Sequence, residues 1–245
     1  MKVGLFIPCY IDQFYPNVGI ATLELLEKLG VDVSYPETQT CCGQPMANSG
    51  FECYSKDSYD LFVKNFQGCD YIVGPTGSCV YHVKHHFNTI DQTEEVKHIR
   101  EHIYEICDFI TNVLGDPAIE ASFPKKVGLH QSCHGLRGLR LGQCSERVGE
   151  PFSYTENQLR KVKGIELVSL TRKDECCGFG GTFAVAEEAI SVKMGNDRLQ
   201  DHIDNGVEVL TGGDMSCLMH LEGLVKRNGI QLEVKHVVEI LNSQC

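Results

Sequence analysis

Eight of the thirteen cysteines fall into two series with the same internal order. Each series consists of a single cysteine, a vicinal pair followed by glycine, and a second single cysteine. Equivalent cysteines of the two series are offset by 124, 135, 135 and 138 residues, so the copies differ only in loop length. This agreement indicates an internal duplication. The predicted ligands are Cys9, Cys41, Cys42 and Cys79 in the first half and Cys133, Cys176, Cys177 and Cys217 in the second.

Four thiols that converge on one point suit an iron–sulfur cluster, and they also suit tetrahedral Zn²⁺. The vicinal pairs favour the cluster, because adjacent cysteines would be strained on one small ion whereas a cluster offers them separate iron atoms. Gly43 and the glycine-rich segment 178–181 allow the backbone to wrap closely around a bulky ligand and to point N–H groups at it. We therefore predict iron–sulfur clusters, with Zn²⁺ as the alternative.

A histidine follows the last cysteine of each series at the same distance. His82 lies three residues after Cys79, and His220 lies three residues after Cys217. Residues three apart share one face of a helix, so each histidine is expected beside the site. It acts there either as a ligand or as a hydrogen-bonding neighbour of the ligands, and the sequence leaves both roles open.

A further group of polar residues, His130, Cys133 and His134, lies at the start of the second series. His134 is expected to hydrogen-bond a thiolate, and the nearby Arg137 is expected to offset negative charge at the cluster or to hold an anionic group of a partner. The cysteines outside the two series are expected to pack as small apolar groups or to lie at the surface. These are Cys53, Cys69, Cys107, Cys144 and Cys245.

Short apolar runs alternate with helical patterns in both halves. Strands are expected at 3–7, 31–34 and 71–73 with helices at 18–29 and 54–66, and then strands at 126–130, 165–170 and 207–210 with helices at 187–202 and 216–226. This alternation predicts an α/β fold of two repeated Rossmann-like βαβ units with parallel sheets, related by a pseudo-twofold axis. The single cysteines follow strands, and the carboxyl ends of parallel strands form the ligand crevice, so each series should converge there.

The segment 115–124 contains two prolines and a glycine, which suits a linker. It divides the chain into two predicted cysteine-rich domains, residues 1–120 and 121–245.

The composition narrows the possible partners. The 245 residues are 42% hydrophobic, which predicts a globular protein, and 22 basic against 33 acidic side chains give a net charge of −11. Such a charge repels phosphate backbones, so a nucleic acid partner is not expected. An apolar stretch of transmembrane length is not present in the sequence, although peripheral association with a membrane through a partner is compatible with it.

The N-terminus lacks the pattern of a signal peptide, which predicts a reducing, cytoplasmic location where clustered cysteines serve metals more often than disulfides. A glycine-rich dinucleotide fingerprint does not follow any predicted strand, so we do not expect NAD or flavin on this chain.

Three sequence segments are similar to a known family: HQSCHGLRGL at 130–139, ECCGFGGTF at 175–183 and DMSCLMHLEGL at 214–224. They closely resemble the cysteine-rich (CCG) iron–sulfur subunit of lactate-utilisation oxidase complexes. More distantly, they are similar to the iron–sulfur subunit of glycolate oxidase and to the cysteine-rich subunit of heterodisulfide reductase. In the latter relatives each unit ends in a further cysteine, where this chain has His82 and His220. The four remaining thiolates in each half point to a [4Fe–4S] cluster.

The resemblance implies an electron-transfer subunit that works with a ferredoxin-like iron–sulfur subunit and a third subunit to oxidise L-lactate. Electrons would pass towards a quinone or another acceptor, and the organic chemistry would take place on other subunits. Two rival functions are a heterodisulfide or thiol reductase subunit and a zinc-stabilised scaffold without catalytic activity.

Overall fold

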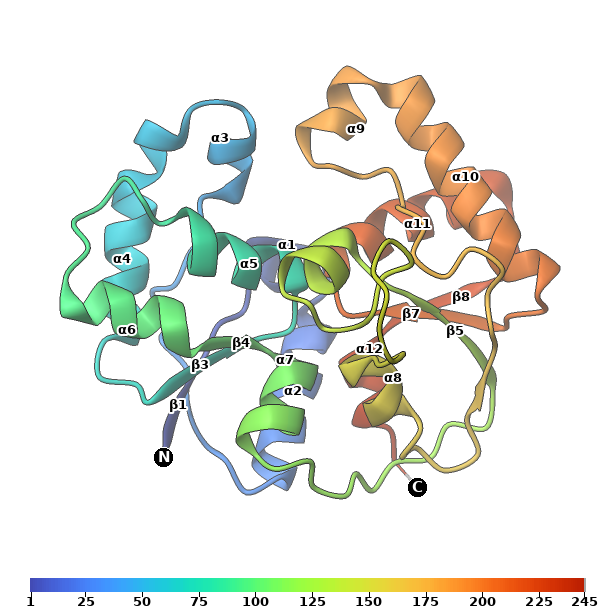
Figure 1. The fold of residues 1–245 in the computed structure, drawn as a ribbon, viewed down its shortest axis with the longest axis horizontal. Coiled ribbons are helices and arrows are strands. Elements are labelled where there is room, and N and C mark those ends of the chain that lie inside the picture. The colour runs from blue at the N-terminus through green and yellow to red at the C-terminus, as the bar shows by residue number, and fades with distance from the viewer. Residues whose placement is uncertain (245) are drawn as a thin grey trace.

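The two halves of the chain contain equivalent parallel sheets in the computed structural model, which describes residues 1–244 (Figure 1). The strands are β1 (Lys2–Leu5), β2 (Asp32–Ser34), β3 (Tyr71–Gly74), β4 (Ile103–Glu105), β5 (Lys126–His130), β6 (Glu166–Leu167), β7 (Val209–Gly212) and β8 (Glu233–His236). The spatial order is β2-β1-β3-β4 in one sheet and β6-β5-β7-β8 in the other, and every pair of neighbours is parallel. The predicted α/β class with two parallel-sheet units is confirmed.

Helices connect these strands in both halves. The first half contains α1 (Cys9–Phe14), α2 (Pro16–Lys28), α3 (Gln44–Asn48), α4 (Lys56–Phe66), α5 (Gly77–His86), α6 (Glu94–His102) and α7 (Ile106–Asp108). The second half contains α8 (Tyr154–Leu159), α9 (Thr182–Ala186), α10 (Glu188–Asp204), α11 (Met215–Asn228) and α12 (Val237–Leu241). Within residues 1–244, every helix is too short or too polar to cross a membrane.

Most predicted elements occur with small shifts of their ends. The expected strand 165–170 is shortened to the two residues of β6, and the expected strand 207–210 begins two residues later, at Val209. The fourth strand of each sheet, β4 or β8, was not predicted. Both are short and lie at the edge of a sheet, and polar side chains interrupt their apolar pattern. The segment 115–124 contains neither a helix nor a strand, and the division at residue 120 stays a prediction.

Local sequence signals explain where α2 and α11 begin and end. Pro16 opens α2 at its first turn, where a missing N–H costs little, and Gly30 follows the helix with a φ of 77°. Asp214 caps the first turn of α11 by accepting a hydrogen bond from the Ser216 N–H, and Gly229 ends that helix with a φ of 64°. The cap at Asp214 thereby places Cys217 in the first turn of α11.

The apolar core continues from one half into the other. One buried cluster includes Leu25 and Leu26 of α2 together with Val238 and Leu241 of α12, and these two helices pack on each other across the halves. A second cluster of the first half is aromatic and surrounds Phe6. Burial of apolar surface on this scale is the main stabilising term of the fold. The core therefore fixes the position of one sheet relative to the other.

A buried carboxylate joins the two halves directly above this core. Asp214, which follows β7, is 1% exposed, and its Oδ2 accepts a hydrogen bond of 2.8 Å from the backbone N–H of Ser78. Its Oδ1 accepts from the hydroxyls of Thr76 and Ser78 at 3.2 Å and 3.1 Å. The N–H of Gly77 also donates to the carbonyl of Gly213 at 3.1 Å. The loops after β3 and β7, which lead to Cys79 and Cys217, are thereby held together.

Replacing Asp214 by alanine should lower the free energy of unfolding by about 2–3 kcal/mol, because the Ser78 N–H would lose its buried acceptor. Asp214→Asn keeps one acceptor oxygen and should cost less. Chemical denaturation of the metal-free protein measures both effects, with exposed Asp204→Ala as the control. Equal stability of Asp214→Ala and the parent chain would contradict this role.

Candidate metal centre

All eight cysteines of the two series line one cavity of about 490 Å³ between the carboxyl ends of the two sheets. Cys9 and Cys133 follow the strands β1 and β5, and Cys79 and Cys217 lie in the first turns of α5 and α11. The vicinal cysteine pairs lie in the loops that precede α3 and α9. These two helices flank the same side of the molecule in Figure 1. The two series therefore share one cavity although each belongs to its own sheet.

The thiols of the first series form a chain of hydrogen bonds from Cys9 through Cys41 and Cys42 to Cys79. Hydrogen bonds from Cys42 and Cys9 lower the pKa of Cys41 to about 3. The hydrogen bond to Cys41, together with burial, raises the pKa of Cys9. One thiol of the set thus ionises first while its neighbours donate to it, and thiolates are the form that binds metals.

The second series repeats this arrangement from Cys133 through Cys176 and Cys177 to Cys217. Hydrogen bonds from Cys133 and Cys177 lower the pKa of Cys176 to about 2. Hydrogen bonds to Cys176 and Cys217, together with burial, raise the pKa of Cys177. The first cysteine of each vicinal pair is therefore the favoured thiolate in both halves.

The glycine after each pair supplies a further donor. The N–H groups of Gly43 and Gly178 each lie 3.4 Å from the sulfur two residues earlier, in hydrogen-bonding geometry. Their φ angles are 86° and 87°, a region that residues with a side chain rarely adopt. A Cβ on Gly178 would lie 2.7 Å from both the Met194 side chain and the Ser191 carbonyl. The backbone conformation and the space available thus both require glycine here.

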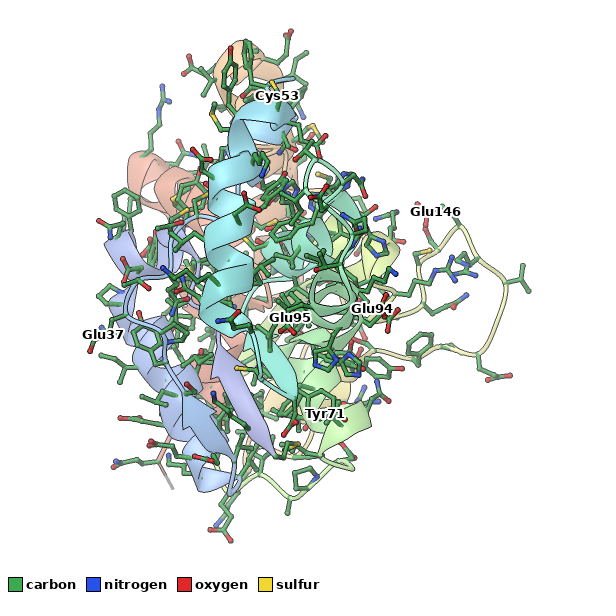
Figure 2. All side chains as sticks on the ribbon, turned by 90° about the vertical axis from the view of Figure 1, so that its left-hand side faces the viewer. Glu37, Cys53, Tyr71, Glu94, Glu95 and Glu146 are labelled. Carbon is green, nitrogen blue, oxygen red and sulfur yellow. The ribbon has the colours of Figure 1, made fainter. Side chains whose placement is uncertain are left out.

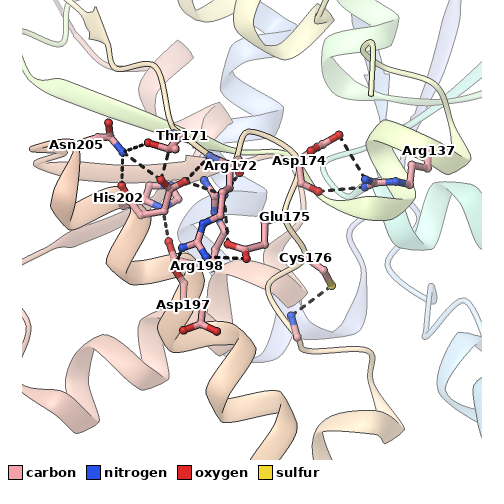
Figure 3. Close-up of polar contacts among 12 residues, drawn as sticks. Arg137, Thr171, Arg172, Asp174, Glu175, Cys176, Asp197, Arg198, His202 and Asn205 are labelled. Atoms are coloured by element: carbon pink, nitrogen blue, oxygen red, sulfur yellow. Dashed lines mark hydrogen bonds and ion pairs between the residues drawn. The ribbon is translucent and has the colours of Figure 1, made fainter. Parts of the chain in front are cut away.

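A buried ion network anchors the loop that leads into the second pair (Figure 3). Arg198 of α10 has a fully buried guanidinium group, 3.2 Å from the Asp201 carboxylate and 4.0 Å from that of Glu175. Asp201 also accepts hydrogen bonds from the backbone N–H groups of Thr171 and Arg172. Removing one partner would leave an uncompensated charge in the interior. The network therefore fixes the approach of the chain to Cys176.

Arg137 is not among the residues that line the cavity, and its charge is paired within the chain. Its Nε donates to Glu146 at 2.9 Å, its Nη1 donates to the carbonyl of Asp174 at 3.2 Å, and its charge also lies 3.4 Å from the Asp174 carboxylate. Glu146 lies on a loop that projects from the body of the molecule (Figure 2). The charge of Arg137 is thus already paired, so this residue fastens the loop to the segment before the second pair instead of compensating a cluster.

His220 contacts the loop around Gly178 directly, whereas His82 reaches the loop around Gly43 through Tyr59. The Nε2 of His82 hydrogen-bonds the Tyr59 hydroxyl at 2.9 Å, and the Tyr59 ring fills the space that a Cβ on Gly43 would need. His220 lies against the backbone carbonyl of Cys177, and both border Gly195 of α10. These contacts favour a supporting role for both histidines.

His134 lies beside the sulfur of Cys133, with 3.9 Å between its Nδ1 and the Sγ atom, and it also lines the cavity. A specific role for His130 was not predicted from the sequence. This residue is 2% exposed, and one ring nitrogen lies within 4.8 Å of the sulfurs of Cys177 and Cys217. Alignment of the two halves was the signal that could have found it, because His130 stands three residues before Cys133 where Phe6 stands before Cys9.

The cysteines outside the two series lie away from this cavity. Cys53 is exposed at the outer end of the first half (Figure 2), whereas Cys69, Cys107 and Cys144 are buried. Among the residues that the structure describes, the lining of the cavity contains none of these four. Cys245 lies outside the described residues.

Comparison with known proteins agrees with the duplication. Residues 3–84 and 127–222 each match the model of the cysteine-rich domain, CCG. The chain is 39% identical to lactate utilization protein A of Bacillus licheniformis, with 100% of both chains covered. The chain belongs to the family of the CCG cysteine-rich domain. The protein of the same name from Bacillus subtilis is also 39% identical over 100% of both chains. The resemblance that the cysteine motifs predicted is therefore confirmed.

Solved structures are less similar to this chain than the relatives named above. A glutamate racemase of Bacillus anthracis covers 98% of this chain and 78% of its own, with 11% identity and a TM-score of 0.39. This similarity is too low to support a functional argument.

Replacing Gly178 by alanine should lower the metal content of anaerobically reconstituted protein, because the new Cβ would displace the loop that carries Cys177. Gly206→Ala is a matched control, since Gly206 also has a positive φ of 71° but open space around it. The control should cost ~1 kcal/mol of stability and leave the metal content unchanged. Full metal content in Gly178→Ala would contradict the close fit.

His220→Ala should retain the metal, because His220 faces the loop backbone and the four thiols of this half remain in place to hold it. Cys217→Ser should lose metal from the second half. Metal analysis of both variants, with circular dichroism as a folding control, separates the two roles. Complete loss of metal from folded His220→Ala would identify this histidine as a ligand.

Proposed function

We propose that this chain is an iron–sulfur electron-transfer subunit of a complex that oxidises L-lactate or a related 2-hydroxy acid. The main support is the convergence of two four-cysteine sets on one cavity in a chain related to lactate utilization protein A. The proposed ligands of the first cluster are Cys9, Cys41, Cys42 and Cys79. Those of the second are Cys133, Cys176, Cys177 and Cys217.

The donor set fits a cluster better than a single ion. Each half offers four sulfurs, as a [4Fe–4S] cluster requires, and two of them are adjacent in sequence. The glycine N–H groups that point at Cys41 and Cys176 resemble donors that stabilise thiolates and sulfides. A tetrahedral Zn²⁺ site would need both members of a vicinal pair at one small ion. These features support [4Fe–4S] clusters over Zn²⁺.

The bound clusters would supply one-electron transfer, and the protein would tune their potentials. Hydrogen bonds from Gly43 and Gly178 make the sulfurs less basic and raise the reduction potential. Burial of Cys42, Cys177 and Cys217 limits the access of water to the ligands. The chain thus contributes ligation, hydrogen bonds and a shared enclosure for both clusters.

The lactate oxidation itself would take place with partner subunits. The family resemblance favours a ferredoxin-like iron–sulfur subunit and a third subunit, in a cytoplasmic complex that delivers electrons to a quinone or another acceptor. Mixing the purified subunits with L-lactate and a dye acceptor tests this assembly. Dye reduction should require this chain and should be lost in a variant that lacks Cys42 and Cys177. Lactate-dependent dye reduction that is unchanged in the absence of this chain would contradict the proposal.

Anaerobically purified protein should contain iron and acid-labile sulfide, and its visible absorbance should bleach on reduction. Cys42→Ser and Cys177→Ser should each remove about half of the iron, because each affects one four-cysteine set. Buried Cys144→Ser, outside both sets, is the control and should leave the iron content unchanged. Stoichiometric zinc without sulfide would instead identify a zinc-stabilised scaffold.

A further inference from the structure

His130 is buried in the second half, and neither of its ring nitrogens has a hydrogen-bond partner. One of them lies within 4.8 Å of the sulfurs of Cys177 and Cys217, which lie within the same distance of each other. A metal bonded to imidazole nitrogen and thiolate sulfur lies roughly 2.0–2.3 Å from each, so donors at this spacing are close enough to bind the same metal centre. A buried polar group without a partner costs about 1–3 kcal/mol, and a bound metal would remove that cost.

The equivalent position in the first half is apolar. Phe6 precedes Cys9 by three residues, as His130 precedes Cys133, and both residues lie at the ends of equivalent strands. The Phe6 ring is buried and packs edge-on against Phe62, with 4.9 Å between the ring centroids. The first centre is therefore bordered by hydrocarbon at the point where the second is bordered by an imidazole.

A second buried group near His130 supports its ligand role. His130 and Glu105 of the first half both line a cavity of about 20 Å³, which is large enough for one water molecule. The Oε1 of Glu105 is buried and has no hydrogen-bond partner. Metal-bound histidines usually donate their second ring N–H to a carboxylate, a carbonyl or water. Glu105, through one water, is placed to accept from His130.

We propose that His130 binds the metal centre of the second half, and that the two centres of the chain therefore differ chemically. This inference rests on the proposed function, because it assigns one more donor to the same centre. The neutral imidazole donates the lone pair of one ring nitrogen and keeps its proton on the other. Imidazole adds a neutral donor beside the four thiolates and leaves the charge of the ligand set unchanged.

The test uses the full chain with 15N-labelled histidine, reconstituted anaerobically with iron and sulfide and partly reduced. Pulsed electron paramagnetic resonance should detect the strong hyperfine coupling of a histidine nitrogen bonded to iron. The coupling should be lost in His130→Phe, which installs the residue of the first half. It should persist in His134→Phe, although His134 also contacts a cysteine of this series. His130→Asn, which is smaller and polar, provides a second variant if the phenylalanine prevents folding.

Cluster-containing protein with no histidine coupling, or with only the weak coupling of a hydrogen bond, would overturn the ligand role of His130 and leave the proposed function intact. Coupling that persists in folded His130→Phe would overturn it as well. Protein without iron and sulfide would instead contradict the proposed function and, with it, this inference.

Discussion

The hydrogen-bonded contact of four cysteine side chains is the constraint on which the rest of each half depends. Thiols placed this close cannot all ionise without a compensating partner, because like charges disfavour one another. The protein meets this problem by letting one sulfur of each set, Cys41 or Cys176, accept hydrogen bonds from two neighbouring thiols and from a glycine N–H. The surrounding structure must hold these donors in place, and it does so with tight loops supported by buried side chains.

The two halves support their loops in different ways. In the first half the support is mainly aromatic, since Tyr59 packs against Gly43 and stacks on Phe87 with 4.1 Å between the ring centroids. In the second half it is ionic, built around the buried guanidinium of Arg198. Aromatic packing tolerates small changes, whereas a buried ion pair loses several kcal/mol when one partner is removed. The second loop should therefore be the more sensitive of the two to substitution of its supporting residues.

The sequence was sufficient to predict the duplicated α/β plan and the two cysteine series, because vicinal cysteines and strand-like runs are local signals. It was not sufficient for β4 and β8, whose pairing depends on a neighbouring strand more than on their own residues. It also could not predict that both series line one cavity, because that depends on how the two sheets pack. Arg137 and His130 show the same limit, because their contacts with Asp174 and with Cys177 and Cys217 join residues that are distant in sequence.

The contact between the halves explains why the two halves cannot have identical residues where they meet. Thr76 and Asp214 occupy equivalent positions before the last cysteine of each series, and they face each other as a hydrogen-bonded pair. Two aspartates there would place like charges together in the interior, at a cost of several kcal/mol. Two threonines would leave the Ser78 N–H without its carboxylate acceptor. The duplicated halves therefore keep the same cysteines but require different residues at their interface. The halves also differ next to the cysteines, since His130 stands beside the second set at the position that Phe6 occupies in the first half.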